Sequence, residues 1–302
     1  MAALTPAIAG VRVRCPAKIN LGFWILGERP DGYHEVDTIL QTVSLEDELT
    51  LEPERAPGIR LELSGRSIQG EATNLVERAW SLLCEEQHVR DRGVRARLTK
   101  RIPVGSGLGG GSSDAAGLLA GANRLFGLGL SDDDLRALGA RLGADVPFLI
   151  RGGTARATGR GEQVRQLCPI RPFWAVLASP PFAIPTTWAY GQVRKGLTHR
   201  GSDARFLETA LAGGSDTEMA AAMRNVFEDV ILPEKPVLGA LKRAIESRGA
   251  IKTQLTGSGS SFFGFVSTHD EALAIAKGIA GTGAEVRVVR TLERGVAVAP
   301  LA

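Results

Sequence analysis

The glycine-rich segment at residues 103–116, PVGSGLGGGSSDAA, carries the strongest chemical signal in this chain of 302 residues. Five glycines within seven positions remove the side chains that would keep backbone amides away from an anion. A strand is predicted at 94–99, and apolar residues at helical spacing follow the segment, so it should lead into a helix N-terminus. Ser112 and Ser113 can add hydroxyl donors there. The pattern predicts a polyphosphate-binding site, with a flexible glycine turn as the simpler alternative.

Two familiar nucleotide-binding motifs do not describe this segment. No Gly-Lys-Ser or Gly-Lys-Thr follows the glycines, as a Walker loop requires. The spacing and the Ser-Ser-Asp ending also differ from the GxGxxG pattern. Free amides and the positive end of a helix would therefore act together on the phosphates.

Two isolated charges are candidates for an ion pair. Asp145 lies in the apolar segment LGADVPF, where a carboxylate is unfavourable without a partner. By itself its position predicts a helix N-cap, with Pro147 in the first turn. Lys18, in CPAKINLGF, adjoins an apolar strand and needs a counter-charge if it is buried, unless it extends to solvent. Asn20 should lie on the same strand face as Lys18.

Three further segments have ordinary structural explanations when taken alone. The segment LTGSGSSFFGF at 255–265 lies between two predicted strands and is typical of a hairpin turn. Tyr33 and His34, in the loop GERPDGYHE, are ordinary loop residues. Trp188 and Tyr190 follow a proline-rich turn and are more typical of packing than of a stacking platform.

Strands and helices alternate along the chain and must position these residues. In the first half we expect helices that begin at Asn74 and Ser131, and strands at 11–15, 19–26, 36–51, 59–63 and 94–99. In the second half we expect strands at 251–255, 262–266 and 286–290, and helices at 203–211, 217–228, 236–247 and from Asp270. A composition shift after Gly153 divides the chain into domains at 1–160 and 161–302.

The composition is that of an ordinary globular protein, with 44% hydrophobic and 23% charged residues. The net charge is only +3 and basic residues are scattered, so nucleic acid is not expected as a partner. Cys15, Cys84 and Cys168 have neither CxxC nor metal-ligand spacing, which favours a reduced, cytoplasmic compartment. No secretory signal is recognisable, and prolines interrupt the uncharged stretch 172–193, so no membrane span is expected. The oligomeric state and metal ligands are not predicted.

The order of these motifs resembles the GHMP kinase superfamily: PAKINL near the N-terminus, PVGSGLGGGSSDAA in the middle and LTGSGSS near the C-terminus. The segments ERPDGYHE, LGADVPF and IPTTWAY resemble those members that act on a substrate with a cytidine diphosphate group. The resemblance covers about 15–265. It implies an α+β fold of two domains, a ribosomal protein S5 domain 2-like N-terminal domain and a ferredoxin-like C-terminal domain, with the site between them.

The resemblance also implies roles for individual residues. Asp145 would be the catalytic base and Lys18 its partner, which would hold the carboxylate ionised and the hydroxyl aligned. The ATP-binding residues would be Pro103, Val104, Gly105, Ser106, Gly107, Leu108, Gly109, Gly110, Gly111, Ser112 and Ser113, with Asn74 and Lys100 near the adenosine. The residues that bind the other substrate would be Asn20, Tyr33, His34, Thr186, Tyr190, Gly257, Ser258 and Gly259.

The implied activity is the transfer of the γ-phosphoryl group of ATP, accompanied by Mg²⁺, to the 2-hydroxyl of a methylerythritol that carries cytidine diphosphate. Such a reaction belongs to the non-mevalonate route to isoprenoid precursors. Two alternatives stay open at this point. The first is a GHMP kinase for mevalonate, homoserine or a sugar, and the second is a non-catalytic nucleotide-binding protein. The presence of both Lys18 and Asp145 speaks against the second.

Overall fold

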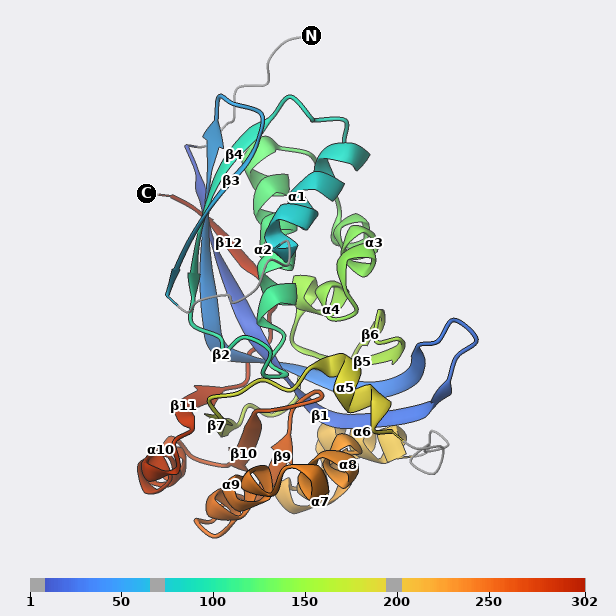
Figure 1. Cartoon of the computed structure of the whole chain (residues 1–302), viewed down its shortest axis with the longest axis vertical. Helices are drawn as coiled ribbons and strands as arrows, with labels where there is room; N and C mark the ends of the chain where they lie inside the picture. Colours follow the sequence, from blue (N-terminus) through green and yellow to red (C-terminus); the bar gives the residue numbers. More distant parts are fainter. Residues whose placement is uncertain (1–8, 66–73, 194–202, 302) are drawn as a thin grey trace.

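Two parts of the molecule are stacked along its long axis in the computed structural model, which describes residues 9–65, 74–193 and 203–301 (Figure 1). The upper part holds an eight-stranded sheet with helices on one face, and the lower part a four-stranded sheet with its own helices. Helix and strand are mixed in both parts, so the predicted α+β class is confirmed.

Two long antiparallel strands form the centre of the larger sheet and extend beyond it as a ribbon (Figure 1). They are β1 (Val11–Glu28) and β2 (His34–Glu54), where the sequence predicts three shorter strands. The main path of the sheet runs β12-β1-β2-β4-β3, with β3 at Gly58–Gly65, β4 at Gly93–Lys100 and β12 at Ala297–Pro300. Two short strands attach to the ribbon, β5 (Thr154–Gly159) to β2 and β8 (Arg224–Asn225) to β1, and β6 (Gln163–Gln166) pairs with β5. The chain therefore returns to the first sheet at its C-terminal end.

Four helices cover one face of this sheet: α1 (Leu75–Glu86), α2 (Gly110–Phe126), α3 (Asp132–Leu142) and α4 (Val146–Arg151). The capping boxes at Asn74 and Ser131 are present, which confirms both predicted helix starts. Helix α2 packs tightly on β1, because a Cβ atom at Gly117 would lie 2.4 Å from Sγ of Cys15. Glycine at this position brings the helix close to the strand that carries Lys18.

The smaller sheet has the strand order β11-β7-β10-β9, all antiparallel. Its strands are β7 (Trp174–Ser179), β9 (Lys252–Leu255), β10 (Phe262–Val266) and β11 (Glu285–Arg290). In chain order this is 4-1-3-2, the arrangement of a ferredoxin-like domain. Helices α5 (Thr186–Gly191), α6 (Asp203–Gly213), α7 (Asp216–Ala222), α8 (Phe227–Glu234), α9 (Pro236–Glu246) and α10 (His269–Gly278), and the short 3-10 helix η1 (Ala280–Thr282), complete this part.

The single helix expected at 217–228 is wrong. The structure divides this segment into α7, the two-residue strand β8 and the start of α8. Arg224 and Asn225 pair in parallel with Gly22 and Phe23 of β1. Pairing with a strand some 200 residues earlier overrides the local helical spacing, which single-sequence periodicity cannot detect.

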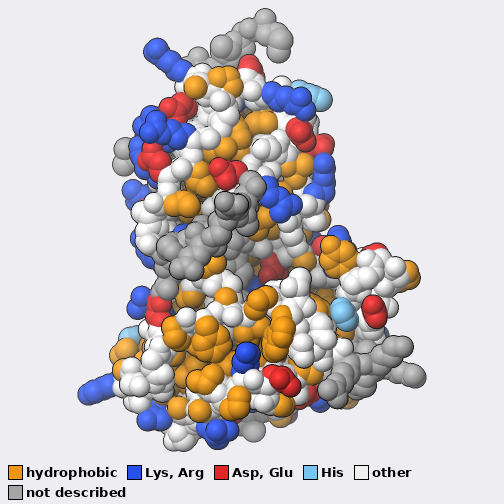
Figure 2. Space-filling model, in the orientation of Figure 1, with side chains coloured by type: hydrophobic (Ala, Val, Ile, Leu, Met, Phe, Trp, Pro, Cys, Tyr) orange, Lys and Arg blue, Asp and Glu red, His pale blue; other side chains and the backbone are white. Residues whose placement is uncertain are grey.

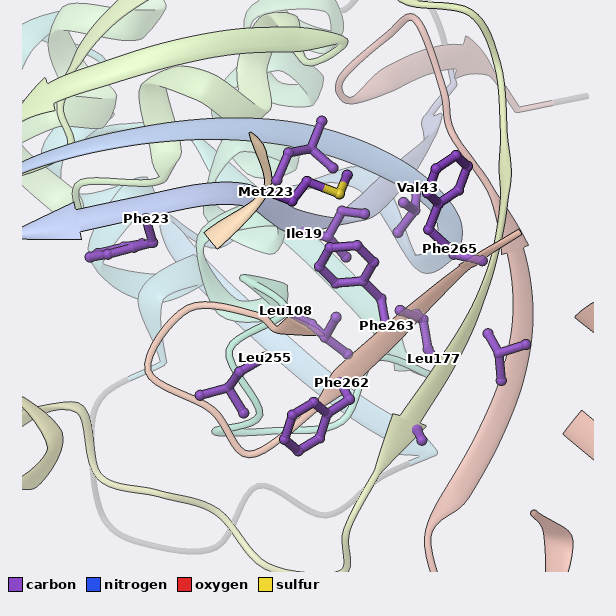
Figure 3. Packing of buried hydrophobic residues seen from close by; sticks show 14 of the residues in the cluster. Ile19, Phe23, Val43, Leu108, Leu177, Met223, Leu255, Phe262, Phe263 and Phe265 are labelled. Atoms are coloured by element: carbon purple, nitrogen blue, oxygen red, sulfur yellow. The ribbon is translucent and has the colours of Figure 1, made fainter. Parts of the chain in front are cut away.

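The glycine-rich segment joins the two parts through a hydrophobic contact. Leu108 is fully buried in the same cluster as Ile19, Leu255 and Phe262, so residues from both sheets surround it (Figure 3). This anchor fixes one point of a loop that otherwise consists largely of glycine and serine. Among the described residues, no helix is long and apolar enough to cross a membrane.

Candidate active site

Lys18 and Asp145 lie beside each other, with 3.5 Å between Nζ of the lysine and Oδ2 of the aspartate. The side chain of Lys18 is 5% exposed, whereas that of Asp145 is 32% exposed. Asp145 stands at the N-cap position of α4, but its side chain makes no capping hydrogen bond. The position that the sequence predicts is therefore correct, and the carboxylate points to the lysine and to solvent instead of capping the helix.

Asn20 holds the other side of the lysine. Nζ of Lys18 donates to Oδ1 of Asn20 at 2.8 Å, as expected for residues on one strand face. The same oxygen accepts the backbone N–H of Gly257 at 2.8 Å, and the amide nitrogen donates to Oγ1 of Thr38. Asn20 is only 1% exposed. The polar atoms of Asn20 thus hold Lys18 and neighbouring segments, and its predicted contact with substrate stays a prediction.

The glycine-rich loop passes directly over this pair. The backbone N–H of Lys18 donates to the carbonyl of Leu108 at 2.9 Å. Gly109 has a φ of +73°, and a Cβ atom there would lie 3.6 Å from Oδ2 of Asp145. Gly107 has a φ of +81°, and a Cβ atom there would lie 2.1 Å from the carbonyl oxygen of Thr256. Both positions thus need glycine for backbone conformation and for space.

Helix α2 starts at Gly110, so residues 110–114 of the predicted loop form its first turn. The N-cap is Gly109, which offers no side chain to the first N–H groups. These N–H groups and the positive helix end lie next to Lys18 and Asp145, which is the environment that binds phosphate. Ser112 is half-buried at this end, beside Gly143.

The hydroxyls of two serines in the predicted ATP-binding segment, Ser113 and Ser106, donate to backbone carbonyls. Oγ of Ser113 is fully buried and donates to the carbonyl of Pro16 at 2.7 Å. Oγ of Ser106 donates to the carbonyl of Pro103 at 2.7 Å. Both hydroxyls therefore fix the loop to its surroundings, and a hydrogen bond from Ser113 to phosphate stays a prediction.

Lys100 is buried between two carboxylates. Its Nζ donates to Asp47 and to Asp114, and the backbone N–H of Ile102 also donates to Asp47 at 2.8 Å. Burial lowers the pKa of Lys100, but the charges of Asp114 and Asp47 outweigh it and raise the pKa above its ordinary value. A Cβ atom at Gly110 would lie 3.2 Å from this Nζ. The lysine lies against the first turn of α2, and its predicted place near the adenosine stays a prediction.

The carboxyl group of Asp114 has a raised pKa in this buried cluster. Burial raises its pKa to about 7, with the charge of Lys100 opposing and that of Asp47 adding to the effect. Its Oδ1 has no hydrogen-bond partner among the described residues. One ammonium group thus compensates two carboxylates beneath the glycine-rich loop.

Asn74 caps α1 through its side-chain oxygen, which accepts the N–H of Val76 at 3.0 Å. Its Nδ2 is buried and lacks a partner among the described residues. The start of α1 adjoins that of α2, because a Cβ atom at Gly111 would lie 3.6 Å from Cδ1 of Leu75. An amide donor at this place agrees with the predicted contact to a nucleotide, which stays a prediction.

Aromatic side chains gather where the β1–β2 turn meets α5. The rings of His34 and Tyr190 lie 5.0 Å apart, and Tyr190 meets Phe227 edge to face at 5.0 Å. Burial, and then the charge of Asp145, raise the pKa of Tyr190. Tyr33 is 56% exposed, and the guanidinium of Arg160 lies 5.0 Å from its ring centre. His34 pairs with Glu28 at the turn end of the ribbon, whereas Lys18 pairs with Thr42 farther from the turn, and Tyr190 lies between His34 and the charge of Asp145.

The C-terminal glycine motif closes the site from the smaller domain. It connects β9 and β10 as the predicted hairpin loop, and its backbone contacts the glycine-rich loop through Ser261 N–H and the carbonyl of Ser106 at 3.1 Å. Oγ1 of Thr256 lies 3.2 Å from the carbonyl of Gly107. Oγ of Ser258 contacts Oγ1 of Thr186 at 3.3 Å. All three sequence motifs therefore converge on one place.

Three residues that were not among the predicted site residues also contact this polar cluster or its supports: Thr38, Thr256 and Asn225. Thr38 and Thr256 could have been found through strand alternation around Asn20 and through the LTGSGSS motif. Asn225 had no such signal, because it falls inside the segment that was predicted to be helical.

The fold and the site are those of a GHMP kinase. The family model "GHMP kinases N terminal domain" matches residues 74–153, and "GHMP kinases C terminal" matches 207–284. A crystal structure of homoserine kinase from Cytophaga hutchinsonii superposes with a TM-score of 0.77 at 20% identity, over 99% of this chain and 100% of the other, and so shares the fold.

Relatives with higher identity define the family within this class. The chain is 39% identical to 4-diphosphocytidyl-2-C-methyl-D-erythritol kinase of Pelotomaculum thermopropionicum, over 91% of this chain and 96% of that protein. It is 41% identical to the enzyme of the same name from Symbiobacterium thermophilum, over 93% and 100%. A crystal structure of 4-(cytidine 5'-diphospho)-2C-methyl-D-erythritol kinase has a TM-score of 0.78 at 34% identity, over 93% and 98%. The chain belongs to the 4-diphosphocytidyl-2-C-methyl-D-erythritol kinase family of GHMP kinases.

Proposed function

We propose that this protein transfers the γ-phosphoryl group of ATP to the 2-hydroxyl of 4-diphosphocytidyl-2-C-methyl-D-erythritol, which yields the 2-phosphate and ADP in isoprenoid precursor synthesis. Family membership supports the substrate. The observation that carries the chemistry is the Lys18–Asp145 pair at 3.5 Å, beside Gly109 at the start of α2. A partly exposed carboxylate, an ammonium group and a helix N-terminus suited to phosphate are thereby within reach of one hydroxyl.

The oxygen of the substrate hydroxyl attacks the γ-phosphorus and ADP leaves. Asp145 accepts the proton of this hydroxyl. Lys18 keeps the carboxylate ionised and orients it, because its own position is fixed by Asn20. The amides of the glycine-rich loop and the end of α2 hold the phosphates and stabilise the charge of the transition state. Positioning and electrostatics dominate, since phosphoryl transfer needs little covalent assistance.

Magnesium would enter with ATP and neutralise charge on its phosphates. Among the described residues, no group of three or more His, Cys, Asp or Glu side chains is placed to hold a metal ion. The ion would therefore be held chiefly by phosphate oxygens and water, with Asp145 and Ser112 beside the start of α2. Such sparse protein ligation is usual for Mg²⁺ at nucleotide sites.

The cytidyl group would lie at the aromatic end of the ribbon. Tyr33 and Tyr190 offer ring faces for stacking, and His34 offers a ring nitrogen for a hydrogen bond with the base. The loop residues Gly257, Ser258 and Gly259, with Thr186, would contact the part of the substrate between base and hydroxyl. Each of these contacts with the substrate is a proposal.

The protein is expected to work in a reducing compartment, the cytoplasm. All three cysteines are free, and Cys15 and Cys84 are buried thiols. Lys and Arg side chains are mixed with Asp and Glu on the face in Figure 2, and the expectation that nucleic acid is not a partner stays a prediction. The division into domains at about residue 160 likewise stays a proposal.

A coupled assay of ADP release tests the substrate. Purified protein with ATP and Mg²⁺ is given the cytidyl substrate, mevalonate or homoserine at equal concentrations, and CMP is added as a competitor. Rapid ADP release with the cytidyl substrate alone, inhibited by CMP, is the expected result. Turnover that prefers mevalonate or homoserine, or that ignores CMP, would refute the proposed acceptor while leaving the kinase class intact.

A further inference from the structure

Asn225 is a buried amide whose side-chain nitrogen is directed at the C-terminal glycine motif. It lies in the two-residue strand β8 and is 3% exposed. Its Nδ2 donates to the carbonyls of Leu255 and Gly257, each at 2.8 Å, and its Oδ1 accepts the N–H of Phe227 at 3.0 Å. Both amide hydrogens and the oxygen are thus used at once.

Glu228, in the first turn of α8, also holds this segment. Oε1 of Glu228 accepts the backbone N–H of Leu255 at 2.7 Å, and Oε2 of the same carboxylate is paired with Lys242. The carbonyl of Leu255 is therefore fixed by β8 and its N–H by the first turn of α8. Residues 255–257 are tied to β8 and α8 as well as to their own hairpin.

The tethered segment in turn reaches the catalytic lysine. Gly257 donates its N–H to Oδ1 of Asn20 at 2.8 Å, and that oxygen also accepts Nζ of Lys18 at 2.8 Å. A Cβ atom at Gly257 would lie only 3.3 Å from the same Nζ. The position of Gly257 thereby limits where Lys18 and its partner Asp145 can stand.

We propose that Asn225 is a positioning residue for phosphoryl transfer: by clamping the carbonyls of Leu255 and Gly257 it holds Gly257 against Asn20, and so holds Lys18 beside Asp145. The proposal rests on the proposed function, since it concerns the same ion pair. It adds a residue that touches neither substrate nor the reacting atoms.

Asparagine suits this position for a specific chemical reason. Two carbonyl oxygens must be met by two N–H donors on one short side chain, while an acceptor faces the N–H of Phe227. An aspartate has the same shape but would place an oxygen against both carbonyls. Asn225→Asp therefore removes the clamp with little change in volume, and Asn225→Ala removes it without adding charge.

A matched control exists elsewhere in the larger domain. Asn123 in the last turns of α2 makes an equivalent two-point tether: Nδ2 donates to the carbonyl of Leu130 at 2.9 Å, and Oδ1 accepts its N–H at 3.0 Å. It stands 13 residues along the helix from Gly110, which corresponds to roughly 20 Å. Asn123→Asp disturbs a backbone tether of the same kind away from the ion pair.

The test measures kcat and both KM values for wild type, Asn225→Asp, Asn225→Ala and Asn123→Asp, with circular dichroism and Tm for each. We expect both Asn225 variants to lose about 10- to 100-fold in kcat, the scale of a misplacement of about 1 Å, with KM for ATP within about threefold of wild type. Asn123→Asp should lower Tm and leave kcat within about twofold. Unchanged kcat in a folded Asn225→Ala protein would overturn the proposal.

A double-mutant cycle separates positioning from general structural damage. If Asn225 acts through Asn20, most of its effect on kcat should vanish in an Asn20→Ala background, whereas the effect of Asn123→Asp should simply add. Fully additive effects of Asn225→Asp and Asn20→Ala would overturn the proposal. Absence of wild-type turnover with the cytidyl substrate would instead overturn the proposed function, so the two failures are distinguishable.

Discussion

Gly109 lies directly against Lys18: a Cβ atom at position 109 would stand 2.9 Å from Cγ and 3.2 Å from Cε of the lysine. The residue also has a φ of +73°, in the left-handed region. The glycine-rich loop therefore does more than offer amides to a phosphate, because the glycine at the seventh position of the PVGSGLG run leaves room for Lys18. Loop and ion pair form one packed unit.

Gly109→Ala should abolish most activity because the new methyl group displaces Lys18 or the loop. We expect kcat to fall by about 100-fold, the consequence of shifting a reacting group by about 1 Å. Gly127→Ala is the matched control: Gly127 ends the same helix with a φ of +60°, and its Cβ would meet no atom within 4 Å. That variant should lose about 1–2 kcal/mol of stability from backbone strain and keep its kcat. Equal kcat for the two variants would contradict the steric argument.

Asp145→Asn should lower kcat by about 100-fold or more, because the amide cannot accept the proton of the substrate hydroxyl. Binding of ATP should change little, since the phosphates are held by the loop and by α2. Steady-state kinetics and a binding titration with a non-hydrolysable ATP analogue measure the two effects separately. Asp133→Asn, which alters a carboxylate that is 88% exposed on α3, serves as the control and should retain full activity. Turnover near the wild-type rate in Asp145→Asn would remove this residue from the role of base.

The ion pair and the phosphate loop could be predicted from sequence because burial makes strong demands. A carboxylate in LGADVPF and an ammonium in an apolar strand each need an opposite charge, so the pairing of Asp145 with Lys18 follows from the residue types. The glycine spacing followed by a helical pattern likewise predicted an uncapped helix end. These requirements follow from neighbouring residues in the sequence, so they can be recognised without knowledge of the fold.

Features that depend on contacts between distant segments could not be predicted. Lys100 meets Asp47 and Asp114 only because β2, β4 and α2 pack together. The break between α7 and α8 arises because β8 pairs with β1, against its own helical spacing. Asn225 becomes important only through that pairing. Single-sequence patterns contain no information on these partners.

Asp114→Asn should change how stability depends on pH. The pKa of Asp114 is raised to about 7 in the folded protein, from 3.8 in its reference state, chiefly by burial. Between these values the folded protein holds the proton more tightly than the unfolded chain, so this group destabilises the wild type as pH rises from about 4 to 7. The stability of Asp114→Asn relative to wild type should therefore increase over this range, by at most about 1.4 kcal/mol per pH unit. Urea titrations at several pH values measure the difference.

Asp134→Asn is the opposite case and controls for a general effect of removing a carboxylate. Hydrogen bonds from the side chain and the backbone of Ser131 lower the pKa of Asp134, so it stabilises the fold above its ordinary pKa and loses this contribution in acid. Its replacement should therefore reduce stability most at neutral pH and least in acid. If the difference in free energy of unfolding between Asp114→Asn and wild type did not change from about pH 4 to 7, Asp114 would be ionised in the folded protein throughout this range, contrary to the prediction.

Tyr190→Ala should weaken binding of the cytidyl substrate, because the ring is proposed to stack on the base. Loss of one base–aromatic stack corresponds to about 1–3 kcal/mol, so KM for this substrate should rise by about 10-fold or more while KM for ATP stays constant. Tyr190→Phe keeps the ring and its edge-to-face contact with Phe227, and should therefore bind the substrate nearly as well as wild type. Phe206→Ala, at a ring that is 69% exposed on α6, controls for loss of an aromatic side chain. If Tyr190→Ala raised both KM values equally, the ring would support the fold of the site without recognising the base.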